Sequence, residues 1–135
     1  MLQLEALVVA VAILAIAAAA RVLVLRRGRR RALAASPPPA AEPYILYFTG
    51  EHCTVCRTHQ EPALSALEGV RIERVDVGAE PDVGRRYGVY TLPTTIVISP
   101  SGTPAHVNYG YISADRLRRQ LSDQAATQAE QLTNL

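Results

Sequence analysis

The feature that most constrains this sequence is a pair of cysteines, Cys53 and Cys56, with two residues between them. The segment 44–49 before the pair is rich in aromatic and β-branched residues, which favours a β-strand. The segment 54–67 after it favours a helix. Because a Cys-x-x-Cys pair at a strand-to-helix turn is typical of redox-active dithiols, this stretch predicts thiol–disulfide chemistry.

Composition leaves three uses open for the cysteines. A chain of 135 residues with 49% hydrophobic content fits one ordinary domain with a terminal appendage. Two cysteines are too few for a disulfide framework, so they exchange disulfides, bind a metal ion or form one structural bridge. A bridge across two residues constrains the unfolded chain little, which makes the structural role the weaker interpretation.

Residues 1–25 predict a transmembrane anchor. Residues 6–20 carry no charge and are nearly all Ala, Val, Leu or Ile, and the apolar pattern continues to Leu25. This length can span a bilayer, with Arg21 extending to the headgroups. A cleaved signal peptide that releases a secreted domain is the alternative, since small residues are abundant at 17–20. No basic residue precedes the apolar run, which argues against a signal peptide.

Residues 26–43 form an Arg-rich juxtamembrane segment followed by a Pro-rich linker. Five arginines follow the apolar run and none precedes it: Arg26, Arg27, Arg29, Arg30 and Arg31. The positive-inside rule therefore predicts a single-pass membrane protein whose domain lies on the cytoplasmic face, with the arginines against anionic lipid. A domain on the extracytoplasmic face is the alternative. The prolines at 37–39 favour extended polyproline geometry, which predicts a stiff spacer.

The charge of the remaining chain argues against a nucleic-acid partner. From residue 41 onward there are eight arginines and eleven acidic residues, a net charge of about −3. A mildly acidic surface without a basic stripe does not favour nucleic-acid binding.

The segment 44–122 predicts an α/β domain. Further strands are expected at 70–77, 94–98 and 104–110, with a short helix at 79–87. A last helix is expected to begin after Ser113 as its N-cap. Residues 123–135 are polar and predict either a C-terminal tail or an extension of that helix.

This order of elements resembles the thioredoxin-like family over residues 44 to about 121. The match includes the Cys-x-x-Cys turn, a Tyr-Gly pair followed by Pro-Thr in the segment 87–95, the turn at 99–102, and Gly110 ahead of the last helix. The resemblance implies a thioredoxin-like fold, a central mixed sheet of about four strands flanked by helices, here preceded by one transmembrane helix.

The resemblance also implies roles for the site. Cys53, at the helix N-terminus where the helix dipole favours a thiolate, is the expected nucleophile, and Cys56 is the resolving thiol. Pro93 is the expected cis-proline facing the pair, and the backbone of Leu92 is expected to bind an extended substrate segment. The implied partners are disulfide-containing client proteins and an unidentified electron donor. No cofactor beyond the Cys53–Cys56 disulfide, and no metal, is expected.

The sequence departs from the family in ways that affect the site. His52 replaces the usual Trp before the first cysteine, and Tyr47 replaces a buried acid. Pro62 lies one residue further from Cys56 than in the standard helix, and the family's first strand and helix have no counterpart. A protonated His52 would lower the pKa of Cys53 while Glu51 would oppose it, so the direction in which His52 modulates the site stays open.

Two other functions remain as alternatives to an oxidoreductase. One is a redox-inactive binding module that holds a partner peptide near Pro93. The other is a metal carrier, because His59 lies three residues after Cys56 and together with Cys53 and His52 it can form a Cys/His site.

Overall fold

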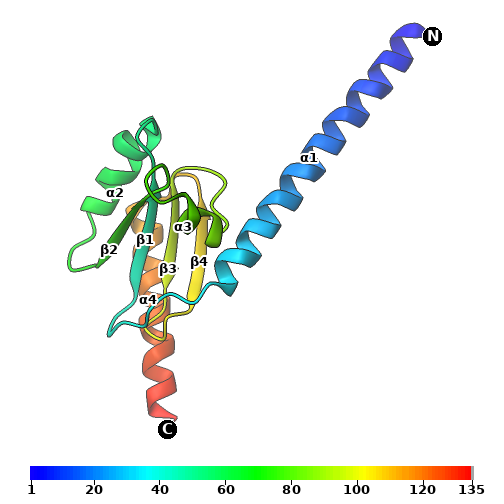
Figure 1. Cartoon of the computed structure of the whole chain (residues 1–135). Helices are drawn as coiled ribbons and strands as arrows, with labels where there is room; N and C mark the ends of the chain where they lie inside the picture. The colour runs from blue at the N-terminus through cyan, green and yellow to red at the C-terminus, as the bar shows by residue number, and fades with distance from the viewer. Residues whose placement is uncertain (135) are drawn as a thin grey trace.

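A computed structural model of the chain describes residues 1–134. It contains a four-stranded mixed sheet with helices on both faces, and a long N-terminal helix that projects from the domain (Figure 1). This arrangement confirms the expected fold class. The elements in chain order are α1 (Leu2–Ala34), β1 (Tyr44–Thr49), η1 (Cys56–Gln60), α2 (Glu61–Ser65), β2 (Ile72–Asp76), α3 (Pro81–Arg86), β3 (Thr94–Ile98), β4 (Pro104–Tyr109) and α4 (Ala114–Thr133).

The sheet has the strand order β2-β1-β3-β4. β1 pairs in parallel with β2, with Phe48 opposite Val75, and antiparallel with β3, with Phe48 opposite Thr94. β3 pairs antiparallel with β4. It follows that β1 and β4 end, and β3 begins, on the same side of the sheet, across the strand ends. We call this side the site end, because the cysteines follow β1 there.

Alternation along the central strands builds two separate cores, since successive side chains of a strand point to opposite faces. Ile45 and Tyr47 face the first core, which is completed by side chains such as Leu64 and Leu117 from the regions of α2 and α4. Tyr44, Leu46 and Phe48 of β1 face the second core. Its buried members are Ala32, Tyr44, Leu46, Phe48, Tyr87, Ile96 and Ile98.

Helix α1 continues past the apolar segment and ends on the domain. It is long and apolar enough to cross a membrane, although a signal sequence near an N-terminus has the same features. Its apolar part is exposed, whereas Gly28 and Ala32 near its C-terminal end are buried. The arginine-rich segment is thus helical, and Ala32 belongs to the second core.

The proline segment, which was expected to act as a spacer, packs along the domain. The N–H of Ala40 donates to the carbonyl of Pro100 at 3.1 Å, and the Tyr44 hydroxyl donates to the carbonyl of Pro38 at 2.9 Å. A Cβ on Gly102 would lie 2.6 Å from the carbonyl oxygen of Pro37, so the turn at Gly102 fits closely against the prolines. Because prolines lack an N–H, the segment can lie on the domain without burying an unpaired donor.

Two further elements differ in extent from the sequence-based expectations. The helix expected over 54–67 is interrupted by the π-helical turn η1 before α2 begins at Glu61. At the other end of the chain, α4 extends to Thr133, so most of the polar C-terminal segment continues the last helix. The side chain of Ser113 accepts a hydrogen bond from the N–H of Arg116, as expected of the N-cap.

Candidate functional site

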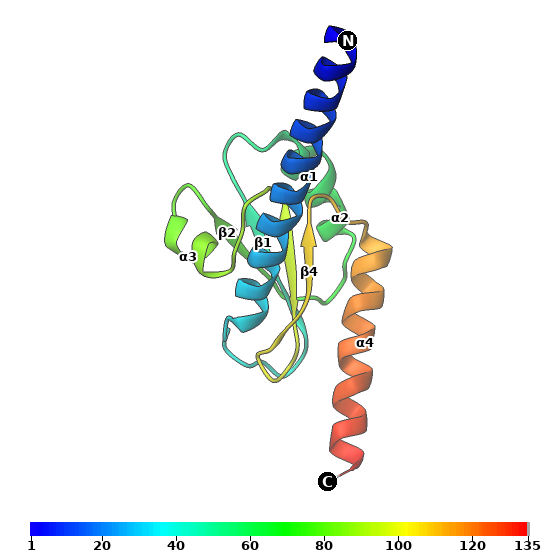
Figure 2. The same cartoon turned by 90° about the vertical axis from the view of Figure 1, so that its right-hand side faces the viewer.

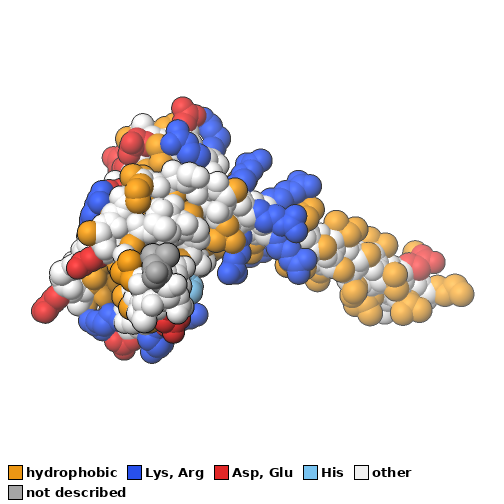
Figure 3. Space-filling view, turned by 90° about the horizontal axis from the view of Figure 1, so that it is seen from below, with side chains coloured by type: hydrophobic (Ala, Val, Ile, Leu, Met, Phe, Trp, Pro, Cys, Tyr) orange, Lys and Arg blue, Asp and Glu red, His pale blue; other side chains and the backbone are white. Residues whose placement is uncertain are grey.

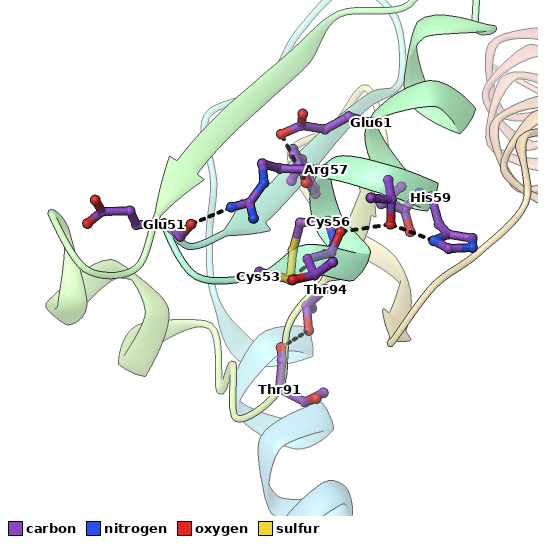
Figure 4. The surroundings of a disulfide bond; sticks show 12 residues. Glu51, Cys53, Cys56, Arg57, His59, Glu61, Thr91 and Thr94 are labelled. Carbon is purple, nitrogen blue, oxygen red and sulfur yellow. Dashed lines mark hydrogen bonds between the residues drawn. A yellow bond between two sulfur atoms is a disulfide. The ribbon is translucent and has the colours of Figure 1, made fainter.

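Cys53 and Cys56 form a disulfide at the site end of the sheet (Figure 4). The two sulfurs differ in accessibility, because Cys53 is half-buried and Cys56 is fully buried within the first core. Only a sulfur that a partner can approach is able to attack or be attacked. The difference in burial therefore favours Cys53 as the sulfur that a partner can reach. Cys56 is shielded from partners and can react only with Cys53.

Backbone geometry around Cys53 favours its thiolate in the reduced state. The N–H of Cys56 donates to the Cys53 sulfur at 3.2 Å, and the N–H of Cys53 donates to the carbonyl of Gly50 at 3.1 Å. The Arg57 guanidinium donates to the carbonyl of Glu51 at 2.5 Å and so brings a positive charge to the same turn. A hydrogen bond to the sulfur and a nearby cation both favour the anion.

The π-helical turn η1 explains the displaced proline. The N–H of Glu61 donates to the carbonyl of Cys56, five residues earlier in the chain. In an α-helix this hydrogen bond joins residues four apart, so the turn contains one extra residue. Pro62 has no N–H to donate and stands in the first turn of α2, where a helix tolerates proline. The extra residue between Cys56 and Pro62 is therefore absorbed in one turn, directly after the cysteines.

The same turn directs Gln60 into the protein. Gln60 is fully buried, and its side-chain amide pairs with the backbone of Ile112, accepting from the N–H at 3.0 Å and donating to the carbonyl at 3.1 Å. Two residues earlier, the N–H of Gly110 donates to the carbonyl of Pro93 at 2.8 Å. Gln60 thus links the helix that contains Cys56 to the segment 110–112, and this segment is itself hydrogen-bonded to Pro93.

The Leu92–Pro93 peptide bond is cis, as the resemblance implies for Pro93. The Thr94 hydroxyl donates to the carbonyl of Thr91 at 2.7 Å, which fixes the turn around the proline (Figure 4). Among the bonds formed within residues 1–134, neither the N–H nor the C=O of Leu92 has a partner. An extended chain laid beside the disulfide can pair with both groups, but the substrate-binding role of Leu92 and Pro93 stays a prediction.

A groove of about 930 Å³ opens beside Cys53. Its walls are mainly apolar and include Val77, Val89, Tyr90 and Leu92. His52 lines its rim and is exposed to solvent, so its influence on Cys53 stays a prediction. The groove can accept apolar side chains from a peptide bound beside the disulfide.

Tyr47 occupies the place of the buried acid, and it is not a substitute base. Burial raises the pKa of the Tyr47 hydroxyl, which keeps the phenol neutral. Its hydroxyl approaches the carboxylate of Glu61 at 3.5 Å, and Glu61 in turn pairs with Arg74 at 2.6 Å. The sequence did not single out Glu61, although it is the carboxylate that approaches the Tyr47 hydroxyl at this position.

The geometry does not support a Cys/His metal site. The His59 ring contacts the Thr58 hydroxyl at 2.7 Å and packs edge-on against Tyr111 at 5.9 Å between ring centroids. Over residues 1–134, no three His, Cys, Asp or Glu side chains gather closely enough to hold a metal ion.

Known structures share the fold of the domain. No protein-family model and no curated protein sequence matches the chain. The X-ray structure of Fasciola hepatica thioredoxin superposes with a TM-score of 0.55 at 22% identity, covering 63% of this chain and 83% of that one. Thioredoxin-2, described as a component of the malaria parasite protein secretion machinery, gives a TM-score of 0.56 at 21% identity, covering 61% and 82%.

A third structure, described as a malarial protein, gives a TM-score of 0.56 at 22% identity and covers 62% of this chain and 97% of that one. These matches establish that the chain has a thioredoxin-like fold. Each of these matches leaves more than a third of this chain uncovered.

Proposed function

We propose that the protein is a membrane-tethered thiol–disulfide oxidoreductase that reduces disulfides of client proteins. The observation that carries the proposal is a disulfide-linked Cys-x-x-Cys pair, with one half-buried and one buried sulfur, at the site end of a thioredoxin-like sheet. The cis bond before Pro93 and the groove beside Cys53 support it.

The reaction begins with the reduced pair. The Cys53 thiolate attacks one sulfur of a client disulfide, forms a mixed disulfide and releases the other client sulfur as a thiolate, which takes up a proton. Cys56 then loses its proton and attacks the Cys53 sulfur, which frees the second client thiol and leaves the Cys53–Cys56 disulfide. Two electrons pass to the client, and a dithiol donor of unidentified identity returns two electrons to restore the pair.

Binding and tuning follow from the surroundings of the pair. The backbone of Leu92 pairs with an extended client segment across from the disulfide, and the groove receives its apolar side chains. His52 modulates the thiolate of Cys53 from the rim of the groove. Because no carboxylate occupies the position of Tyr47, we expect a water molecule or another group to take the Cys56 proton during resolution.

Tethering and the direction of electron flow belong to the same proposal. Helix α1 has the length and apolar character of a membrane span, and the arginines after it favour a domain on the cytoplasmic face. That compartment is reducing, which favours operation as a reductase. A domain on the extracytoplasmic face, with a different direction of exchange, is the alternative that a protease-protection assay of a tag after residue 135 decides.

Insulin-disulfide reduction by the full-length protein in detergent, with dithiothreitol as donor, tests the proposal. We expect the wild-type protein to accelerate reduction and Cys53→Ser to abolish the acceleration. Ser65→Ala, an exposed change in α2, serves as the control and should reduce insulin like the wild type. Equal activity of Cys53→Ser and the wild type would exclude the oxidoreductase and favour a redox-inactive binding module.

A further inference from the structure

Exposed apolar side chains of the domain gather around the disulfide. Outside α1, the large exposed hydrophobic residues within 1–134 are Val55, Tyr90, Tyr111 and Leu132. Val55 lies between the cysteines, Tyr90 precedes the cis-proline, and Tyr111 follows β4. Three of the four thus lie at the site end, and only Leu132 lies far from it, near the end of α4.

Helix α1 projects beyond that same end. Figures 1 and 2 show, from two directions, that its N-terminal part extends past the site end, while the C-terminus of α4 points the opposite way. If the apolar part of α1 lies in a bilayer, the site end therefore faces the membrane and the end of α4 faces away from it.

Close packing between α1 and the domain, which we call the seam, fixes the direction in which α1 projects. An added Cβ on Gly28 would lie 2.7 Å from the carbonyl oxygen of Gly88 and 2.8 Å from both the Tyr109 hydroxyl and the Tyr90 ring. Leu25, Gly28 and Ala32 are the covered positions on this stretch of α1, and their spacing of three and four residues places them on one face of the helix. Arg31 also donates to the Tyr90 hydroxyl at 2.8 Å.

The position of the seam gives the depth of the site. Gly28 follows Leu25, the last residue of the apolar run, by three residues, or about 4.5 Å along a helix that rises about 1.5 Å per residue. The headgroup region on each side of a bilayer is roughly 5–7 Å thick. Tyr90, which packs against Gly28, therefore falls at headgroup level, where tyrosine is enriched.

The positive charge on α1 next to the domain is complementary to an anionic membrane surface. Figure 3 shows basic side chains gathered on α1 between the domain and the apolar part of the helix. Arg26, Arg27 and Arg30 are exposed there. Each basic residue held near an anionic bilayer adds to the electrostatic attraction.

We propose that the site end of the domain is seated on the headgroups of an anionic membrane, with Val55, Tyr90 and Tyr111 in contact with lipid. The inference rests on the tethering in the proposed function and adds a fixed orientation to it. A disulfide that reaches Cys53 then approaches along the membrane surface, so the clients are chains held at that surface.

The sequence contains no tryptophan, which allows a direct test with single fluorescent reporters. Full-length Leu14→Trp, Tyr111→Trp and Leu132→Trp are reconstituted into vesicles of phosphatidylcholine and phosphatidylglycerol, with and without lipids brominated either near the carbonyl end or near the methyl end of the acyl chain. All three positions are exposed in the structure. We expect emission at positions 14 and 111 to be quenched and blue-shifted, and emission at position 132 to be unaffected.

Each result bears on the proposal. Quenching at 14 alone overturns the seated orientation and leaves the tether intact, whereas no quenching at any position overturns the tether as well. Neither result changes insulin reduction in detergent, so failure of this inference is distinct from failure of the oxidoreductase. Equal quenching at 111 in vesicles without phosphatidylglycerol would overturn the role of anionic lipid.

A variant of the seam gives an independent check. Gly28→Ala combined with Tyr111→Trp should reduce the quenching at 111, because the added methyl group meets the backbone of Gly88. Ala34→Val, at the exposed end of α1, is the matched control and should leave the quenching unchanged. Unchanged quenching in Gly28→Ala would contradict a fixed seam.

Discussion

The two faces of the sheet are closed by different parts of the chain. The first face is covered by α2 and by the first part of α4, both of which lie within the segment 44–122 expected to fold as a domain. The second is covered in part by Ala32 of α1 and by Ala35 and Ala40 of the segment after it. The end of α1 therefore takes part in the core, and within residues 1–134 α1 is the element that precedes β1.

The two faces also hold the two halves of the site by different means. On the first, buried hydrogen bonds from Gln60 to Ile112 hold the helix of Cys56. On the second, close packing of Gly28 against Gly88 and Tyr90 holds the loop that leads to Pro93. Polar bonds and steric fit respond differently to mutation, and this difference can be measured.

Gln60→Leu should have the largest effect on stability. It leaves the N–H and C=O of Ile112 buried without partners, and such a group costs about 1–3 kcal/mol, so the free energy of unfolding should fall by roughly 2–5 kcal/mol. Urea denaturation of the full chain in detergent measures the change.

Gln120→Leu is the matched control on the same face. Gln120 exchanges two hydrogen bonds with Asn108, at 2.8 and 2.9 Å, but both side chains are only partly buried. Water can replace those bonds, so we expect a loss of less than about 1 kcal/mol. Similar losses of unfolding free energy in the two variants would show that the buried hydrogen bonds of Gln60 stabilise the fold no more than the partly exposed ones of Gln120.

Truncation should have the next largest effect, and it tests the second face. A chain that begins at residue 26 keeps the end of α1, whereas one that begins at residue 44 loses Ala32 and the proline segment from the core. Uncovering on the order of 100 Å² of apolar surface at about 25 cal/mol per Å² lowers the free energy of unfolding by roughly 2.5 kcal/mol. Equal urea midpoints for the two chains would mean that the second core is complete without α1.

Gly28→Ala should change the free energy of unfolding by a smaller amount. The sign of the change shows whether α1 is packed on the domain. Alanine favours a helix over glycine by about 1 kcal/mol, so an undocked helix would become more stable. At the seam, overpacking costs about 1–3 kcal/mol. We therefore expect a net loss of about 1–2 kcal/mol in urea denaturation, and a gain in stability would mean that α1 does not pack on Gly88 in solution.

The smallest expected effect is a loss of stability at alkaline pH. Burial raises the pKa of Tyr47 in the first core and of Tyr87 and Tyr109 on the second face above the ordinary value of 10.0. Above that pH the unfolded chain loses protons that the folded chain retains, so stability is complete below pH 10.0 and declines above it. Urea midpoints on either side of this pH measure the decline.

Tyr47→Phe should make that decline less steep, because phenylalanine does not titrate whereas Tyr87 and Tyr109 still do. A decline that is equally steep in the variant would assign the effect to other groups.

The sequence predicted the parts of the fold that local patterns determine. Apolar, β-branched runs specified β1 and β3, and Ser113 marked the start of α4. The cysteines and Pro93 were located correctly in the fold because their motif depends on neighbours in sequence. The catalytic roles of Cys53 and Cys56, and those of Leu92 and His52, stay predictions.

The remaining features depend on contacts between distant residues. Gln60 lies 52 residues from Ile112 in the chain, so its polar side chain gave no sign of burial. Only the displacement of Pro62 hinted at an irregular turn there. Likewise, Gly28 lies within an arginine cluster that suggests a solvated segment, and its contact with Gly88 becomes visible only once α1 meets the domain.

Trapping of the mixed disulfide tests the central claim, that Cys53 is the attacking sulfur. Reduced Cys56→Ser protein is mixed with oxidised insulin, and the products are analysed by non-reducing mass spectrometry. We predict that a covalent adduct through Cys53 accumulates, because no resolving thiol is present to release it. An adduct that forms with Cys53→Ser but not with Cys56→Ser would contradict the claim and assign the attack to Cys56.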